Sequence, residues 1–227
     1  MYTSDQFKQS IAIPEYADWE CDGFGLDTLE HCLNKKYFCS YPSVNYKFNQ
    51  LGYRHGTLEQ YRGDEILAVG DSFTVGLGVN VEQTWPECLS RLLNYPVLNF
   101  SLNGASNDWM ARKTKILLQY FQPKAVIVHY SFTHRRERPN ADWTDYERIM
   151  CDPLHTDEEN LSNWQHNQEK LTDICGAIPL IHTAIWNWHT PHVPDVLVPP
   201  RQDLARDSFH YGPKTHQFFA TSLLEFL

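Results

Sequence analysis

The chain of 227 residues carries 28 acidic and 19 basic side chains, which gives a formal net charge of −9. This excess of negative charge argues against a nucleic-acid partner, because phosphate neutralisation requires a basic surface. Hydrophobic residues make up 42% of the sequence and aromatic residues 14%, a composition typical of a globular protein. The apolar runs are far shorter than the roughly 20 residues of a membrane-spanning helix. The sequence therefore predicts a single soluble domain without a membrane span.

Residues 1–62 precede the first predicted strand and are rich in aromatic and turn-forming residues, such as Trp19 and Tyr53. We expect them to form an irregular extension that packs on the core, which residues 63–227 build. The first five residues include neither the basic segment nor the apolar stretch of a secretory signal. This predicts a cytoplasmic protein.

Four apolar runs alternate with segments of helical periodicity, a pattern typical of a parallel sheet with helices on both faces. The predicted strands are Glu65–Val69, Val97–Phe100, Ala125–Tyr130 and Pro179–Ala184. The predicted helices are Trp85–Leu93, Asn107–Phe121, Leu161–Gly176 (with Ser162 or Asn163 as its cap) and Lys214–Phe226. The fold class is therefore α/β.

Gly70-Asp71-Ser72-Phe73 lies where the first apolar run turns into a helix, and Asp207 and His210 lie near the other end of the chain. At such a turn a serine projects above the sheet, and the N–H groups of the next helix favour developing negative charge. A serine hydroxyl becomes a nucleophile when an imidazole takes its proton and a carboxylate orients that imidazole. Ser72, His210 and Asp207 provide one candidate for each role. As an alternative, Asp71, Ser72 and Asp207 are also favoured residue types for capping a helix.

The sequence motifs around these residues, taken in chain order, resemble those of the SGNH (GDSL) hydrolase family. The resemblance rests on the Gly70–Gly78 block, on the Val97–Gly104 block and on the Asp-x-x-His pair. It implies a three-layer, flavodoxin-like fold in which Ser72 is the nucleophile and Asp207 and His210 complete the triad. It also implies that the N–H groups of Ser72 and Gly104 form an oxyanion hole, and that no cofactor is required.

The family's third block, Gly-x-Asn-Asp, has no match in this chain. Its asparagine would donate to the oxyanion, and Thr133 stands at the corresponding place after the third predicted strand. A threonine hydroxyl can also donate a hydrogen bond, but its side chain is shorter than that of asparagine. Loss of one oxyanion donor costs about 2.7–4 kcal/mol of transition-state stabilisation. Asn107, on the neighbouring loop, is the second candidate for this donor. We therefore expect weakened or altered activity.

Two further segments are candidates for substrate binding. Trp186 and Trp188 follow the fourth predicted strand at alternating positions, so both could line the mouth of the site; ordinary packing is the alternative. Arg135 and Arg136 belong to a short basic run after the third predicted strand. This run would attract an anionic substrate or, alternatively, form a solvated loop.

The histidines and cysteines follow no familiar metal-ligand spacing. His182, His189 and His192 lie close together in sequence but match no zinc pattern. The six cysteines contain no Cys-x-x-Cys pair, so most are expected to be reduced thiols. A disulfide or a metal is the alternative for the cysteines at 21, 32 and 39. We expect no metal site.

The expected function is hydrolysis of a carboxylic ester with a short acyl group, or of an O-acetyl sugar, so the predicted partner is a small-molecule or glycan ester. A catalytically silent binding protein of the same fold would explain the missing asparagine. An acyl transferase would use the same residues with a sugar hydroxyl in place of water. A flavodoxin-type phosphate or flavin binder would use the turn at Ser72 as an anion cradle but has no role for His210. The oligomeric state stays open.

Overall fold

A four-stranded parallel sheet forms the centre of the protein, in a computed structural model that describes residues 4–22, 26–27, 43–56, 61–140, 146–185 and 196–227. The strands are β3 (Ile66–Gly70), β4 (Val97–Asn99), β5 (Val126–Tyr130) and β8 (Leu180–Ala184), in the spatial order β4-β3-β5-β8. Every residue of β3 and β5 is buried. Apolar strands of this kind require cover on both faces of the sheet.

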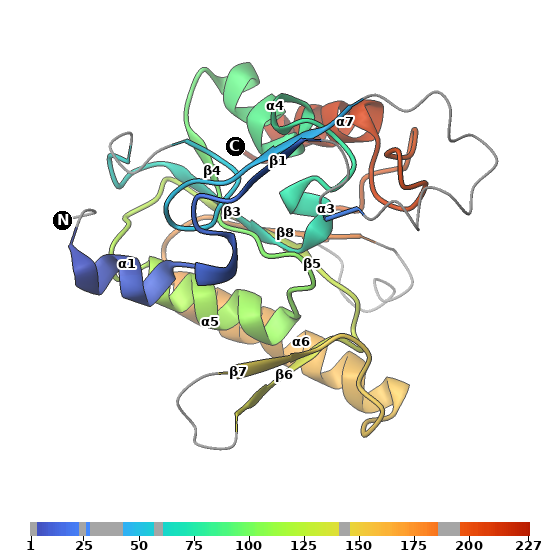
Figure 1. The fold of residues 1–227 in the computed structure, drawn as a ribbon. Helices are drawn as coiled ribbons and strands as arrows, with labels where there is room; N and C mark the ends of the chain where they lie inside the picture. Colours follow the sequence, from blue (N-terminus) through green and yellow to red (C-terminus); the bar gives the residue numbers. More distant parts are fainter. Residues whose placement is uncertain (1–3, 23–25, 28–42, 57–60, 141–145, 186–195) are drawn as a thin grey trace.

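Helices provide this cover (Figure 1). One face carries α4 (Trp85–Leu93) and α7 (Pro213–Leu223), and the other carries α1 (Asp5–Ile11), α5 (Asn107–Leu117) and α6 (Asp157–Cys175). Because side chains alternate along a strand, Ile66 and Ala68 of β3 pack with α4 and α7, whereas Leu67 and Val69 pack with the second group. The predicted three-layer α/β architecture is confirmed.

The predicted strands and helices of the core are all present, with some shifted ends. α6 begins at Asp157, earlier than predicted, because Thr156 and not Ser162 or Asn163 is its N-cap. Thr156 and Glu159 form a reciprocal capping box, which satisfies two backbone N–H groups at the start of the helix. α5 ends before the predicted Phe121, and α7 is followed by the 3₁₀ turn η6 (Leu224–Phe226).

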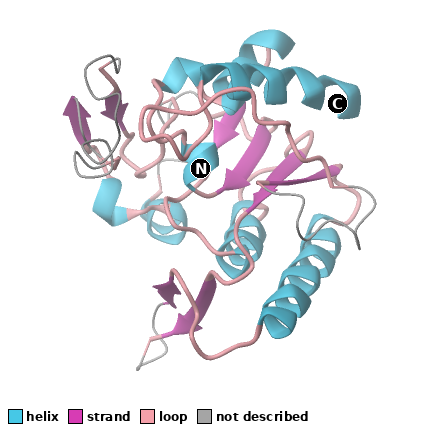
Figure 2. Ribbon diagram, turned by 90° about the vertical axis from the view of Figure 1, so that its right-hand side faces the viewer, coloured by secondary structure: helices cyan, strands magenta, loops and turns pink. Residues whose placement is uncertain are grey.

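Two antiparallel strands that the sequence did not predict follow β5, namely β6 (Arg136–Pro139) and β7 (Tyr146–Ile149). Figure 2 shows this pair standing apart from the four-stranded sheet. Its residues are half-buried or exposed and mostly polar, so they lack the apolar alternation that identifies a strand in a sequence. Arg112 of α5 fixes the pair through two hydrogen bonds to Glu137, of 3.1 and 2.6 Å.

The described part of the N-terminal extension contains four short elements. Besides α1 it contains the 3₁₀ turn η1 (Pro14–Tyr16) and the antiparallel strands β1 (Glu20–Asp22) and β2 (Asn45–Lys47). Phe7 and Ile11 of α1 are fully buried in the core. Lys113 of α5 donates a hydrogen bond of 2.9 Å to the Ile11 carbonyl. The described residues outside these short elements belong to neither a helix nor a strand, which agrees with the expected irregular extension.

Candidate active site

Ser72 is the first residue of α3 (Ser72–Val75), a helix of four residues directly after β3. Asp71 is the N-cap of α3, because its side chain accepts a hydrogen bond of 3.0 Å from the Phe73 N–H. Gly70 is required at the end of β3, since a Cβ there would lie 2.2 Å from the Thr74 hydroxyl oxygen. The capping alternative is thus correct for Asp71. The same capped turn places Ser72 at the carboxyl edge of the parallel sheet, where ligands bind in such folds.

Asp207 and His210 lie in the loop that precedes α7. Asp207 Oδ1 accepts the N–H groups of Phe209 (2.9 Å) and His210 (3.0 Å), and Oδ2 is hydrogen-bonded to His210 Nδ1. Burial raises the pKa of Asp207, but the hydrogen bonds from the His210 side chain and the two backbone N–H groups outweigh it and hold the pKa below its ordinary value. The N-cap of α7 is Gly212, so Asp207 does not cap that helix.

His210 Nε2 lies 2.9 Å from Ser72 Oγ, although the two residues are 138 positions apart in the chain. Because His210 Nδ1 donates its proton to Asp207, Nε2 is the nitrogen with the free lone pair, and it accepts the hydroxyl proton of Ser72. Ser72, Asp207 and His210 are 2%, 5% and 9% exposed. The structure therefore brings these three predicted residues together in the order that a Ser-His-Asp triad requires.

The backbone N–H groups of Ser72 and Gly104 have no hydrogen-bond partner within the described ranges. Gly104 lies in the loop after β4, and this loop is held beside β3 because the Leu102 N–H donates to the Gly70 carbonyl (3.1 Å). The φ of Gly104 is +74°, a conformation that favours glycine. Met150, the residue directly after β7, covers it so closely that a Cβ on Gly104 would lie 2.7 Å from the Met150 sulfur.

The two predicted side-chain donors have different surroundings. Thr133 is 8% exposed, and no described residue forms a hydrogen bond with its hydroxyl. The Asn107 amide is held by the loop after β5: its Oδ1 accepts the Ser131 N–H (2.9 Å), and its Nδ2 donates to the carbonyls of Ser131 (3.3 Å) and Phe132 (3.4 Å). Because both ends of the amide are engaged, Asn107 positions the loop that carries Thr133. Of these two side chains, Thr133 is the one whose donor group no described residue engages.

The two arginines expected to attract an anionic substrate are paired within the protein. Arg135 forms a buried ion pair with Asp71 (2.6 Å), and the Ser131 hydroxyl donates to the same carboxylate oxygen (2.6 Å). Arg136 lies 3.8 Å from the carboxylate of Asp108. The structure thus differs from the expected free basic run, because neighbouring carboxylates from β3–α3 and α5 neutralise both charges.

Aromatic rings that the sequence analysis did not single out surround His210. The ring centroids of Phe73 and Phe209 lie 4.6 and 5.1 Å from that of His210. Phe132 lies nearly parallel to Phe209, at 6.4 Å, and Phe209 is 42% exposed. Two of these rings could have been predicted from their positions in the sequence, since Phe73 directly follows Ser72 and Phe209 directly precedes His210.

Trp186 and Trp188, predicted to line the mouth of the site, lie outside the described residues. Within the part of the chain that the structure describes, no group of three or more His, Cys, Asp or Glu side chains could hold a metal ion, and Cys21, Cys88, Cys151 and Cys175 are free. Among the described helices, none combines the length and the apolar character needed to cross a membrane.

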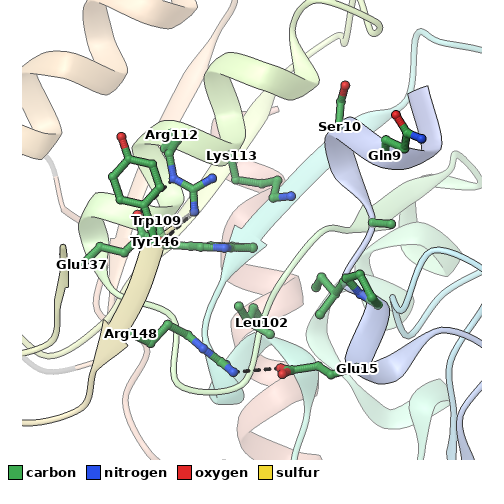
Figure 3. Close-up of a pocket in the computed structure, with 13 residues that line it drawn as sticks. Gln9, Ser10, Glu15, Leu102, Trp109, Arg112, Lys113, Glu137, Tyr146 and Arg148 are labelled. Atoms are coloured by element: carbon green, nitrogen blue, oxygen red, sulfur yellow. Dashed lines mark hydrogen bonds and ion pairs between the residues drawn. The ribbon is translucent and has the colours of Figure 1, made fainter. Parts of the chain in front are cut away.

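A cavity of about 790 Å³ lies between α1, α5 and β7, and no triad residue lines it. Four of its charged groups form two ion pairs: Arg148 binds Glu15 (2.8 Å), as Figure 3 shows, and Arg112 binds Glu137. Arg148 also donates to the Asn103 carbonyl (2.7 Å). These contacts tie β7 to the loop that carries Gly104, which gives the polar lining of the cavity a structural role.

No protein-family model and no curated protein sequence matches the chain. Among solved structures, a protein from Desulfitobacterium hafniense described as a lipolytic member of the G-D-S-L family has a TM-score of 0.50 at 15% identity, covering 72% of this chain and 99% of its own. A structure of TesA has a TM-score of 0.49 at 14% identity, covering 72% of this chain and 98% of its own. An acetyl xylan esterase from the rumen bacterium Butyrivibrio proteoclasticus has a TM-score of 0.48 at 14% identity, covering 74% of this chain and 64% of its own.

At this level of identity the likeness to the Desulfitobacterium hafniense protein shows the fold. The chain has the SGNH/GDSL hydrolase fold, as its separated motifs predicted.

Proposed function

We propose that this protein is a serine ester hydrolase in which Ser72, His210 and Asp207 form the catalytic triad. The observation that carries the proposal is the 2.9 Å contact between Ser72 Oγ and His210 Nε2, combined with the hydrogen bond from His210 Nδ1 to Asp207. A serine in this arrangement can lose its proton to the imidazole as it attacks a carbonyl carbon, and the carboxylate stabilises the imidazolium that forms. The SGNH/GDSL hydrolase fold supports the same reaction class.

In the proposed reaction, Ser72 Oγ bonds to the acyl carbon while its proton moves to His210 Nε2. The carbonyl oxygen becomes an oxyanion and accepts hydrogen bonds from the N–H groups of Ser72 and Gly104, with the Thr133 hydroxyl as the third donor. His210 then protonates the leaving alcohol, which departs and leaves an acyl-enzyme. A water molecule gives a proton to His210 and attacks the acyl carbon. The bond between this carbon and Ser72 Oγ then breaks, His210 returns the proton to Ser72 Oγ, and the carboxylic acid leaves.

For the substrate we propose a small-molecule or glycan ester with a short acyl group, such as an O-acetyl sugar. The ring of Phe209 beside His210, with Phe132 stacked against Phe209, suits a small apolar acyl group, and Met150 narrows the space over Gly104. If a sugar hydroxyl takes the place of water in the second step, the same acyl-enzyme gives acyl transfer.

Labelling with a fluorophosphonate tests this proposal. An activated serine attacks the phosphorus atom and displaces fluoride, so the wild-type protein should gain the mass of one probe on Ser72 when it is weighed by mass spectrometry. Ser72→Ala should abolish the labelling and, like His210→Ala, lower turnover of an activated acetyl ester by on the order of a thousandfold or more. Both variants should melt close to the wild-type temperature.

Ser101→Ala is the matched control, because Ser101 is also a buried serine and its hydroxyl has no hydrogen-bond partner among the described residues. It should label like the wild type. A wild-type protein that stays unlabelled would support the silent binding protein, and equal labelling of the wild type and Ser72→Ala would rule out Ser72 as the nucleophile.

A further inference from the structure

The N-terminal extension contacts both segments that supply the triad. Arg54 lies just before β3 in the chain and is 2% exposed. Its NH1 donates to the carbonyls of Val75 (3.2 Å) and Gly76 (2.6 Å), and its NH2 donates to the carbonyl of Val79 (2.8 Å). These carbonyls belong to the end of α3 and to the loop that follows it. Because a helix cannot satisfy its own last carbonyls, Arg54 completes the short helix that begins with Ser72.

A second set of contacts continues from this loop to Asp207. The Tyr46 hydroxyl accepts a hydrogen bond from the Gly78 N–H (2.7 Å) and donates one to Asp27 Oδ1 (2.6 Å). Asp27 in turn forms an ion pair with Arg206, in which Arg206 NH2 lies 2.8 Å from Oδ1 and Arg206 Nε contacts Oδ2. The side chains of Arg206 and Asp27 are 2% and 0% exposed. Arg206 immediately precedes Asp207.

The loop after α3 and the segment before Asp207 are also in direct steric contact. Gly78 has a φ of +78°, and a Cβ on it would lie 2.8 Å from the Ala205 Cβ. A larger residue at position 78 would therefore clash with the segment before Asp207, and Tyr46, Asp27 and Arg206 bond the two segments together. We name these three residues the buried link.

We propose that the buried link is a positioning device for the catalytic site, which makes the N-terminal extension part of the enzyme's machinery. The inference rests on the proposed function of Ser72 and His210. Those residues come from distant parts of the chain, and the reaction requires their contact to be held within a fraction of an ångström. A 1 Å misplacement caused by a change far from the reacting atoms can cost on the order of a hundredfold in rate. Tyr46, Asp27 and Arg206 act through the backbone on either side and are positioning residues.

Tyr46→Phe provides the test, because it removes the hydroxyl that joins Gly78 to Asp27 and retains the ring that lies under Arg54 (4.5 Å from the centroid to Cζ). Tyr53→Phe is the matched control. Tyr53 is an equally buried tyrosine of the same extension, and its hydroxyl donates a bond of the same 2.6 Å length, but to the Ile11 carbonyl. Both variants lose one buried hydroxyl, whereas only Tyr46→Phe interrupts the buried link.

We expect both variants to have lower melting temperatures than the wild type. Tyr46→Phe should lower kcat for an activated acetyl ester by about ten- to a hundredfold, with KM unchanged, because it misaligns the reacting groups and leaves substrate binding intact. Its rate of fluorophosphonate labelling should fall by the same factor. Tyr53→Phe should retain the wild-type kcat, KM and labelling rate.

Should Tyr46→Phe fail to fold, Arg206→Lys is the second variant. Lysine keeps the positive charge beside Asp27, but its single nitrogen cannot replace the two nitrogens with which Arg206 bonds both oxygens of the Asp27 carboxylate. An active wild type with equal kcat values for Tyr46→Phe and Tyr53→Phe, or with an unchanged kcat for Arg206→Lys, overturns the inference and leaves the proposed function intact. A wild type that neither labels nor turns over the ester overturns both.

Discussion

Acidification is expected to destabilise this protein through His129, a fully buried residue of β5. Thr183 Oγ1 lies 2.7 Å from His129 Nδ1 and donates its own proton to the Val128 carbonyl (3.0 Å). The hydroxyl must therefore accept the proton of His129 Nδ1, which leaves Nε2 unprotonated. Nε2 is buried without a hydrogen-bond partner among the described residues. Burial consequently lowers the pKa of His129 to about 4, against the attraction of the Asp71 carboxylate, because a proton at Nε2 would create a charge without an acceptor.

The size of the effect follows from the difference between the folded and unfolded states. A histidine in the unfolded chain has a pKa of about 6.5. Between that value and the folded pKa of about 4, the unfolded state binds a proton that the folded state excludes, so the free energy of unfolding falls as the pH falls. At about 1.36 kcal/mol per pH unit, the loss from this one residue is roughly 3 kcal/mol, and its contribution is complete above the unfolded pKa.

Urea unfolding followed by circular dichroism, between about pH 7 and pH 4, measures this loss in the wild type and in His129→Gln. Glutamine keeps a polar side chain but does not titrate. The effects of groups that do not interact with His129 cancel in the difference between the two proteins. That difference should therefore change by about 3 kcal/mol across the range, in favour of the variant at low pH. A difference that is constant with pH would refute the assignment of the acid sensitivity to His129.

Two further substitutions test the surroundings of Ser72. Arg135→Met should lower the free energy of unfolding by about 3–5 kcal/mol, because it leaves the buried Asp71 carboxylate without its ion-pair partner. Arg138→Met is the control, because it breaks a half-exposed ion pair with Glu147. An equal loss of unfolding free energy in both variants would contradict the argument. Thr133→Asn should preserve or raise turnover of an activated acetyl ester, because the amide donates from a longer arm; a large loss of kcat would place the third oxyanion donor elsewhere.

Features that depend on a few consecutive residues could be predicted from the sequence. The strand β5 and the helix α4 were predictable because burial on both faces and helical amphipathicity both produce a periodic pattern of apolar residues. The turn at Asp207 was predictable for a similar reason, since Asp207 bonds the backbone of Phe209 and His210, all within four consecutive positions. The motif order then indicated that Ser72 and His210 would meet.

The ion pairs and hydrogen bonds between distant groups could be identified only once the chain was folded. The sequence favours a solvated side chain for Arg135, because no neighbouring residue indicates that Asp71, 64 positions away, lies beside it. Asp27 likewise shows no local signal of its contact with Arg206, which is 179 positions away in the chain. The physical reason is that hydrogen bonds and ion pairs act over a few ångströms in space, so a pairing between remote segments is set by the topology that brings them together.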